Sequence, residues 1–335
     1  MQVKIKCRFK GEIFKMKKRN FLFLLAAPLL LVSCGGSSEE VIPTGETVPE
    51  TEVSTHFKKA TESLASADAI GMKLEMNAKS AITIDSASGD YALKGTSKSD
   101  VNATLKAGFK GLREEKLSDV KASLTGEISM NAESKMGMGG SEASSTATSA
   151  SLKGNAGLYV DNGYLYADAE SLRSFLEIIA GATGVKFDKD TSLKGKASLV
   201  DKEGDANPIP TFLEQIKWDE VVDQVKDTFS KELDTIKTKA GDYAYVFKGD
   251  SSKIFGTGST DQTSIDITGE TVFSVSFNDL GLTGIGFETN TTFETSMTGM
   301  TQKTEIEASA KASFFYGNNV TVEDVPNPSS FTEMK

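Results

Sequence analysis

The sequence predicts an α+β fold in which helices pack on a large antiparallel β-sheet. Several long segments alternate apolar and polar residues with a period of two, as strands do when they bury only one face. Three other segments repeat apolar residues at helical spacing. Asn162-Gly163 lies between two short apolar segments and favours a tight hairpin. Consecutive strands with one polar face indicate an antiparallel meander.

The alternation is clearest in four apolar rows, each opposed by a polar row. These rows run along residues 72–84, 101–109, 120–132 and 306–314. Shorter strands are predicted at 158–160, 164–166, 243–248, 265–267, 271–277 and 281–293. Residues 134–150 are small and low in complexity, so we expect a hairpin loop with strand extensions at either end. No helical pattern follows the glycines of 281–286, which favours a β-bulge over a phosphate-binding loop.

Helices are predicted at 54–68, 168–180 and 211–238. Ser54 or Thr55 is expected to cap the first helix and Asp168 the second. The third follows Pro208 and Pro210, and Gly241 is expected to end it. Each helix carries its apolar residues on one side only, so each is expected to pack on the sheet.

The first 33 residues contain a positive segment followed by an apolar one. The positive segment (Lys17, Lys18 and Arg19) precedes about a dozen apolar residues, fewer than the ~20 that a membrane-spanning helix needs. Leu31, Val32, Ser33 and Cys34 follow, and they resemble the lipobox at the end of a bacterial lipoprotein signal peptide. The resemblance implies peptidase recognition of Leu31, Val32 and Ser33, attachment of diacylglycerol to the Cys34 thiol, cleavage before Cys34 and acylation of the new N-terminus. We expect the natural start at Met16.

Residues 34–53 are predicted to be the lipidated cysteine and a flexible linker, and residues 54–335 a single domain. The predicted location is extracytoplasmic, with lipid anchorage to the cell membrane, or to the outer membrane if the cell has one. Segment 1–33 holds eight Lys or Arg and one Glu, so its removal changes the net charge from −10 to about −17. So acidic a domain should repel nucleic acid, which leaves the lipid to hold it at the membrane.

The order of helices and strands resembles the LolA/LppX-like family of lipoprotein and lipid carriers. Two segments add to the resemblance: residues 158–166 are similar to the hairpin before that family's central helices, and residues 320–326 to its closing strand and proline. The resemblance covers roughly residues 54–331. It implies a curved sheet, a half-barrel, with helices on its concave face and an apolar pocket between them.

Few residues of the sequence are suited to catalytic chemistry. His56 is the single histidine, and no cysteine follows Cys34. The sequence therefore offers no complete set of His and Cys metal ligands and no complete Ser/His/Asp triad. We interpret His56 as an exposed residue at the start of the first helix. We therefore predict that the protein is not an enzyme and has no cofactor and no metal site.

Alanine is frequent in the inward rows, although it is a poor strand former. Two explanations remain open: either the alanines pack closely against the helices, or they leave volume for an apolar ligand such as an acyl chain. The expected lining of such a pocket is Met76, Leu105, Leu124, Phe175, Ile179, Phe229 and Phe314. The predicted function is binding or carrying a lipid or other apolar ligand. The alternative is a structural or host-facing surface lipoprotein, such as an adhesin, without a small-molecule ligand.

Overall fold

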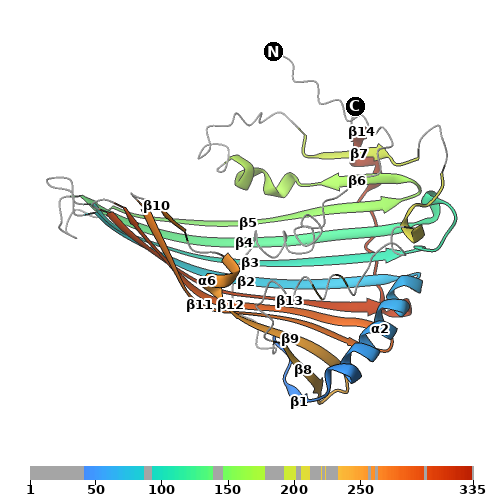
Figure 1. Cartoon of the computed structure of the whole chain (residues 1–335). Coiled ribbons are helices and arrows are strands. Elements are labelled where there is room, and N and C mark those ends of the chain that lie inside the picture. Colours follow the sequence, from blue (N-terminus) through green and yellow to red (C-terminus); the bar gives the residue numbers. More distant parts are fainter. Residues whose placement is uncertain are drawn as a thin grey trace. The chain divides into compact units, whose positions relative to one another are not determined.

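The computed structural model describes residues 41–86, 93–138, 146–177, 192–200, 205–211, 220, 223, 233–255, 258–260, 263–297 and 300–333. All described residues belong to one compact unit, Val32–Lys335. That unit is built on one open β-sheet of fourteen strands (Figure 1). The prediction of a large antiparallel sheet is confirmed.

The strands are β1 (Gly45–Thr47), β2 (Ile70–Ser86), β3 (Leu93–Lys110), β4 (Lys121–Met138), β5 (Thr146–Asp161), β6 (Tyr164–Asp168), β7 (Lys194–Ser198), β8 (Leu233–Thr238), β9 (Tyr243–Asp250), β10 (Gly258–Thr260), β11 (Thr263–Asn278), β12 (Gly281–Met297), β13 (Met300–Tyr316) and β14 (Thr332–Glu333). The α-helices with described bounds are α2 (Glu50–Ser66) and α6 (Ser251–Phe255). Short 3-10 helices are η2 (Leu117–Asp119), η4 (Glu170–Leu172), η5 (Gly317–Asn319) and η6 (Pro328–Ser330).

The sheet consists of two meanders joined side by side. Its order is β1-β8-β9-β11-β12-β13-β2-β3-β4-β5-β6-β7-β14, with β10 beside β11. The pairing of β13 with β2 connects the two halves over the full length of both strands. All of these pairs are antiparallel except the short contact of β14 with β7. The strands at the two edges, β1 and β14, are very short, which limits the unpaired backbone available for edge-to-edge association.

The period-two pattern gives the sheet two different faces. On β2, residues such as Leu74 and Met76 lie on what we call the apolar face, whereas Lys73, Glu75 and Asn77 lie on the polar face. The predicted hairpin turn is confirmed, because both Asn162 and Gly163 have positive φ. The predicted β-bulge is also confirmed: the register of β11 and β12 shifts between Ser276 and Phe277.

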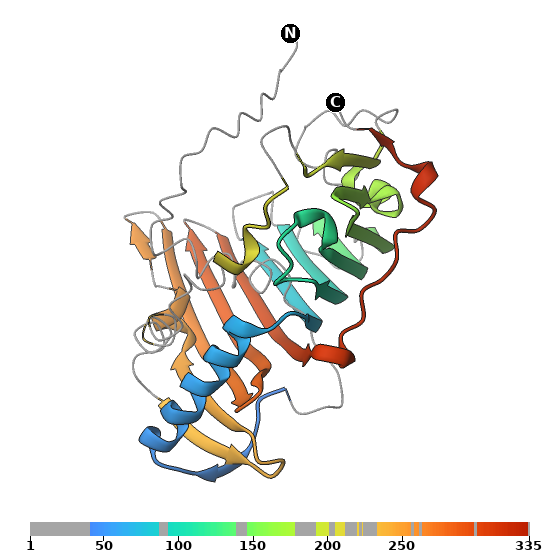
Figure 2. The ribbon, with the colours of Figure 1, turned by 90° about the vertical axis from the view of Figure 1, so that its right-hand side faces the viewer.

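Helix α2 packs on the apolar face at one end of β9, β11 and β12, as Figure 2 shows. The Phe57 ring meets those of Phe277 and Tyr245 edge-on, at centroid distances of 5.1 and 5.7 Å. Val53 and Ala60 are fully buried beside it. The predicted helix at 54–68 is therefore confirmed, although it begins at Glu50. Pro49, rather than Ser54 or Thr55, precedes its first turn.

Two segments differ from their predictions. Residues 41–53 were predicted as linker, yet residues 45–47 form β1, which pairs with β8, and Val53 is buried in α2. Residues 233–238 were predicted as the end of a helix, but they form β8, which pairs with β9. Gly241, at φ +91°, ends no helix; it forms the turn between these two strands.

The other predicted helices are described only in part. Asp168 was expected to cap the second helix, but it is the last residue of β6, and Ala169 precedes the first turn of η4. Asp168 does accept a hydrogen bond from the backbone N–H of Glu170 at 3.2 Å, and residues 173–177 are helical. At the predicted helix 211–238, residues 211, 220 and 223 are helical, and the helical residues begin two positions earlier, at 209. Residues 178–180 of one prediction, and residues 212–219, 221–222 and 224–232 of the other, lie outside the described residues.

Both ends of the described chain lie on the polar face. At the N-terminal end, Ile42 packs with Ile236, Ala244 and Val246. At the C-terminal end, residues 320–333 cross β2–β7, and Figure 2 shows this segment in red on the right, beside the green strands. We call residues 320–333 the C-terminal segment. Its Phe331 packs with Tyr159 and Tyr166.

Candidate functional site

The apolar face of β13, β2, β3 and β4 brings together four of the predicted pocket residues. Phe314 lies opposite Met72, and Leu124 lies in the same row across the sheet. Leu105 belongs to the next row and Met76 to the row after that. The strand register thus places Phe314, Met76, Leu105 and Leu124 on one face of four adjacent strands, within three successive rows.

The alanines of this face alternate with large residues across the strands. Ala107 lies between Met72 and Leu124, and Ala310 lies beside Met76. Ala107 and Ala310 are buried. The strand register therefore places these small residues directly beside large ones on the same face. The large residues remain half-buried in places, and the Leu158 side chain is 43% exposed.

The helices cover the two halves of this face unequally. The principal contacts of α2 and α6 are with β8, β9, β11 and β12. The face of β2–β5 carries Leu158 and Phe109, large apolar side chains that are 43% and 37% exposed. This second half therefore presents apolar area that the described helices leave open.

The other predicted site residues are placed less completely. Phe175 lies in the helical segment 173–177, which follows η4 beside the edge of β5, and it is half-buried. Ile179, Phe229, Leu31, Val32, Ser33 and Cys34 lie outside the described residues. Within the described residues, no helix is long and apolar enough to cross a membrane.

A ring of four buried hydroxyl groups holds α6 to the apolar face. Ser251 bonds to Thr271 at 3.0 Å and to Thr291 at 2.7 Å. Thr289 closes the ring with 2.7 Å bonds to both threonines. Each hydroxyl can donate one bond and accept another, so the ring satisfies its own polar groups. No sequence pattern distinguishes these four residues, because serine and threonine are common throughout these strands.

His56 is less exposed than predicted. Its ring stacks on that of Tyr243 at 4.0 Å, and its Nδ1 lies 2.5 Å from Asp279 Oδ1. Lys59 donates a second hydrogen bond to the same carboxylate at 3.2 Å. These bonds, the one from His56 above all, lower the pKa of Asp279. Because the cluster ties α2 to the turn between β11 and β12, we assign it a structural role.

No group of three or more His, Cys, Asp or Glu side chains in the described ranges is arranged as a metal site. The polar face, by contrast, carries several cavities. One of about 480 Å³ lies beside the N-terminal residues 41–44, and another of about 570 Å³ lies beside the C-terminal segment. Neither is lined by the predicted pocket residues. The predicted binding surface for an apolar ligand and these polar cavities therefore lie on opposite faces of the sheet.

Comparison with known proteins gives little further guidance. No family model matches the chain, and no curated protein matches it. Among solved structures, the chain is similar to a β-barrel-like protein of the domain of unknown function DUF1849 from Brucella abortus. The match has 8% sequence identity, covers 75% of this chain and 100% of the other, and has a TM-score of 0.15.

Proposed function

We propose that the protein is an extracytoplasmic lipoprotein, anchored through an acylated Cys34, whose apolar sheet face binds a lipid or another apolar ligand without catalysis. The observation that carries the proposal is the open apolar area on β2–β5, where Leu158 is 43% exposed. In this proposal, the sheet curves around that face as a half-barrel and the helices enclose the ligand. Such an arrangement is how an acyl chain would be removed from water.

The amount of apolar surface supports a ligand of acyl-chain size. Covering one large apolar side chain contributes about 1.5–3 kcal/mol, so a chain that covers several residues of one row gains enough to bind. Row neighbours on adjacent strands are about 4.8 Å apart, so a row across β2–β5 is comparable in length to a fatty acyl chain. Leu124 and Leu158 are direct neighbours in such a row.

Ligand binding is tested on protein that carries Cys34→Ala, because this change removes any lipid attached to the cysteine. Organic extraction and mass spectrometry should then find a co-purified lipid, and a dansyl-labelled fatty acid should bind saturably. Leu158→Glu places a charge on the apolar face and should weaken binding at least about tenfold. Ser151→Glu is the matched control, since Ser151 is exposed on the polar face of the same strand.

The absence of both a co-purified lipid and saturable binding would contradict the proposal and favour the alternative, a structural surface lipoprotein without a ligand. The observation that supports this alternative is that buried alanines lie beside large residues within the rows.

Anchorage is tested separately. Cys34→Ala should move the protein from the membrane fraction to the soluble extracytoplasmic fraction, because the acidic domain has no comparable attraction for anionic lipid. Ser33→Ala retains a small residue before the cysteine and serves as the control. Retention of the Cys34→Ala protein in the membrane fraction would show that the lipobox interpretation is wrong.

A further inference from the structure

A polar cavity lies on the face of the sheet opposite to the proposed lipid site. Its volume is about 570 Å³, and its floor is formed by β3, β4 and β5. The C-terminal segment forms one wall through Glu323 and Pro326, and η4 with the end of β6 forms another. The side chains that matter for its chemistry are Lys106, Glu127, Tyr159, Asp168, Glu170 and Glu323.

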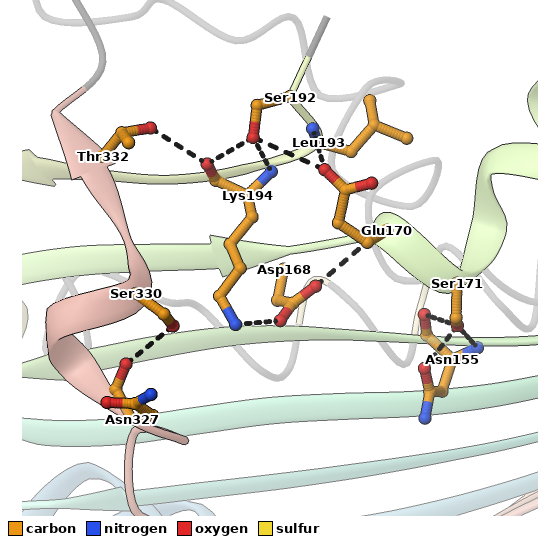
Figure 3. A network of polar contacts seen from close by, with 10 residues as sticks. All are labelled: Asn155, Asp168, Glu170, Ser171, Ser192, Leu193, Lys194, Asn327, Ser330 and Thr332. Carbon is orange, nitrogen blue, oxygen red and sulfur yellow. Dashed lines mark hydrogen bonds and ion pairs between the residues drawn. The ribbon is translucent and has the colours of Figure 1, made fainter. Parts of the chain in front are cut away.

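The wall at η4 is held by groups that are already paired (Figure 3). Asp168 forms an ion pair with Lys194 at 2.8 Å. Glu170 pairs with Arg173 at 2.8 Å and accepts a hydrogen bond from the backbone N–H of Leu193 at 2.6 Å. The Arg173 hydrogen bond and then the Leu193 one lower the pKa of Glu170. These two carboxylates are therefore committed to the protein itself.

The opposite wall is fixed by the docking of the C-terminal segment. The backbone N–H of Glu323 donates to Ser123 Oγ at 2.9 Å, and Thr125 Oγ1 donates to Glu323 Oε1 at 3.2 Å. These contacts hold the Glu323 side chain at the cavity and leave its second carboxylate oxygen available. In the described part of the chain, neither Glu323 nor Glu127 has an ion-pair partner.

Tyr159 supplies the observation that points to a ligand. Its side chain is buried, at 9% exposure, in a cluster with Tyr166 and Phe331. The ring lies flat over Gly157, where a Cβ atom would come within 2.6 Å of it. The hydroxyl thereby points along the cavity floor, and no other group of the described residues forms a hydrogen bond with it. The oxygen atom of this hydroxyl is open to the cavity, so a ligand bound there can form a hydrogen bond with it.

The charges around this hydroxyl favour a cation. Burial raises the pKa of Tyr159, and the carboxylates of Glu323 and Asp168 raise it further, so the phenol stays neutral. Two carboxylates without ion-pair partners, Glu127 and Glu323, face a single amine, that of Lys106. The described residues provide no group of three metal ligands. A compact donor with several N–H groups fits this set of acceptors better than a metal ion or an anion does.

We propose that this cavity binds a small ligand through a primary ammonium group, which donates hydrogen bonds to the Tyr159 hydroxyl and to the Glu323 carboxylate. Glu127 adds attraction from the cavity floor. The site is separate from the apolar face, because its side chains point to the other side of the same strands.

The test uses three probes of equal chain length: 1,4-diaminobutane, 1,4-butanediol and succinate. Each is titrated into the full-length protein labelled with 3-fluorotyrosine, and the fluorine resonance of Tyr159 is assigned by its loss in Tyr159→Phe. We expect diaminobutane to shift this resonance saturably and to bind at least about tenfold more tightly than the diol or the diacid. Equal binding of the diol, or no shift with diaminobutane, would overturn the proposal.

Two pairs of variants distinguish the site from general attraction to an acidic surface, with affinities measured by calorimetry. Tyr159→Phe keeps the buried ring and should weaken diaminobutane binding about three- to tenfold, whereas Tyr166→Phe in the same cluster should not. Glu323→Gln should weaken it at least about tenfold, whereas Asp324→Asn, which removes a charge next to the cavity, should change it less than about twofold. Equal losses within each pair would show that diaminobutane binds by net charge alone.

Discussion

Gly108→Ala should release the C-terminal segment from the sheet. Gly108 lies on the polar face of β3, directly under the backbone of Thr321. A Cβ atom at this position would lie 2.0 Å from the Thr321 carbonyl oxygen and 2.9 Å from its carbonyl carbon. Ordinary contacts need about 3.5 Å, so the segment must move by more than about 1 Å. Neither neighbour is a flexible side-chain end that could turn away.

The cost follows from what the segment buries. Val320 is 3% exposed, and its loss from the core costs about 1.5–3 kcal/mol. The hydrogen bond from Glu323 N–H to Ser123 contributes roughly another 1 kcal/mol. Alanine is favoured over glycine in a strand by about 0.5–1 kcal/mol, which offsets part of the loss. We therefore expect the free energy of unfolding to fall by about 2–3 kcal/mol, and further if Phe331 also leaves its cluster.

The measurement combines urea unfolding, followed by circular dichroism, with limited proteolysis of residues 320–333. Gly126→Ala is the matched control: its Cβ would meet Leu105 Cδ2 at 2.7 Å, the end of a flexible side chain. We expect less than about 1 kcal/mol of change there. Two results together would refute this reasoning: Gly108→Ala unfolds at the same urea concentration as the wild type, and its C-terminal segment resists protease equally well. They would show that the segment does not pack directly on Gly108.

Three further predictions concern the helices. Phe57→Ala should lower the free energy of unfolding by about 3–5 kcal/mol, because the ring is 4% exposed between Tyr245 and Phe277, whereas the exposed Lys58→Ala should change it by less than about 0.5 kcal/mol in the same urea assay. Thr271→Val should cost about 1–3 kcal/mol by leaving Ser251 and Thr289 with unmet hydrogen bonds, and an equal effect of Thr268→Val, an exposed position of β11, would refute that reason. Asp279 has a lowered pKa in the folded protein, so its contribution is present above the ordinary carboxyl pKa near 4 and is lost as the pH falls through the folded value. The Tm difference between wild type and Asp279→Asn should accordingly be larger at pH 6 than at pH 3, and a difference independent of pH would contradict the assignment.

The long strands were predictable because one side of each remains polar. On β2, Lys73, Glu75 and Asn77 alternate with Leu74 and Met76, and only a strand separates such residues onto two faces. The strands nevertheless extend beyond the apolar rows, as β4 does to Met138. Their ends are rich in Ser, Thr, Gly and Lys, which form no apolar row, and pairing with long neighbours decides their structure.

The errors arose where local pattern and distant pairing disagree. Leu233 and Ile236 are three residues apart, a spacing that fits a helix, and the residues before them continue the helical pattern. The pairing of this segment with β9 decides in favour of a strand, and β-branched Thr235 and Ile236 suit it. In residues 41–53, the few apolar side chains are diluted by Glu, Thr and Pro. Their partners, such as Thr235 and Ile236, are nearly 190 positions away, so no local pattern reveals the contact.

The polar cavity was out of reach of sequence reasoning for the same reason. Tyr159 belongs to the predicted hairpin and Glu323 to the predicted closing segment, and only the crossing of the sheet by the C-terminal segment brings them together. A usable signal existed at Gly157, two residues before Tyr159, because a glycine at i−2 on a strand leaves room on the same face for a large ring.

The two proposed sites make different demands on the fold. The apolar site depends on how the strands pair, since β13 must lie beside β2 for Phe314 to join Met76 and Leu105. The amine site depends instead on the C-terminal segment, which supplies Glu323 and covers the Tyr159 ring through Phe331. Because successive side chains on a strand point to opposite faces, a ligand on one face touches none of the side chains that bind on the other. Loss of the C-terminal segment should therefore abolish amine binding while the apolar face keeps its rows, so evidence against one site leaves the other standing.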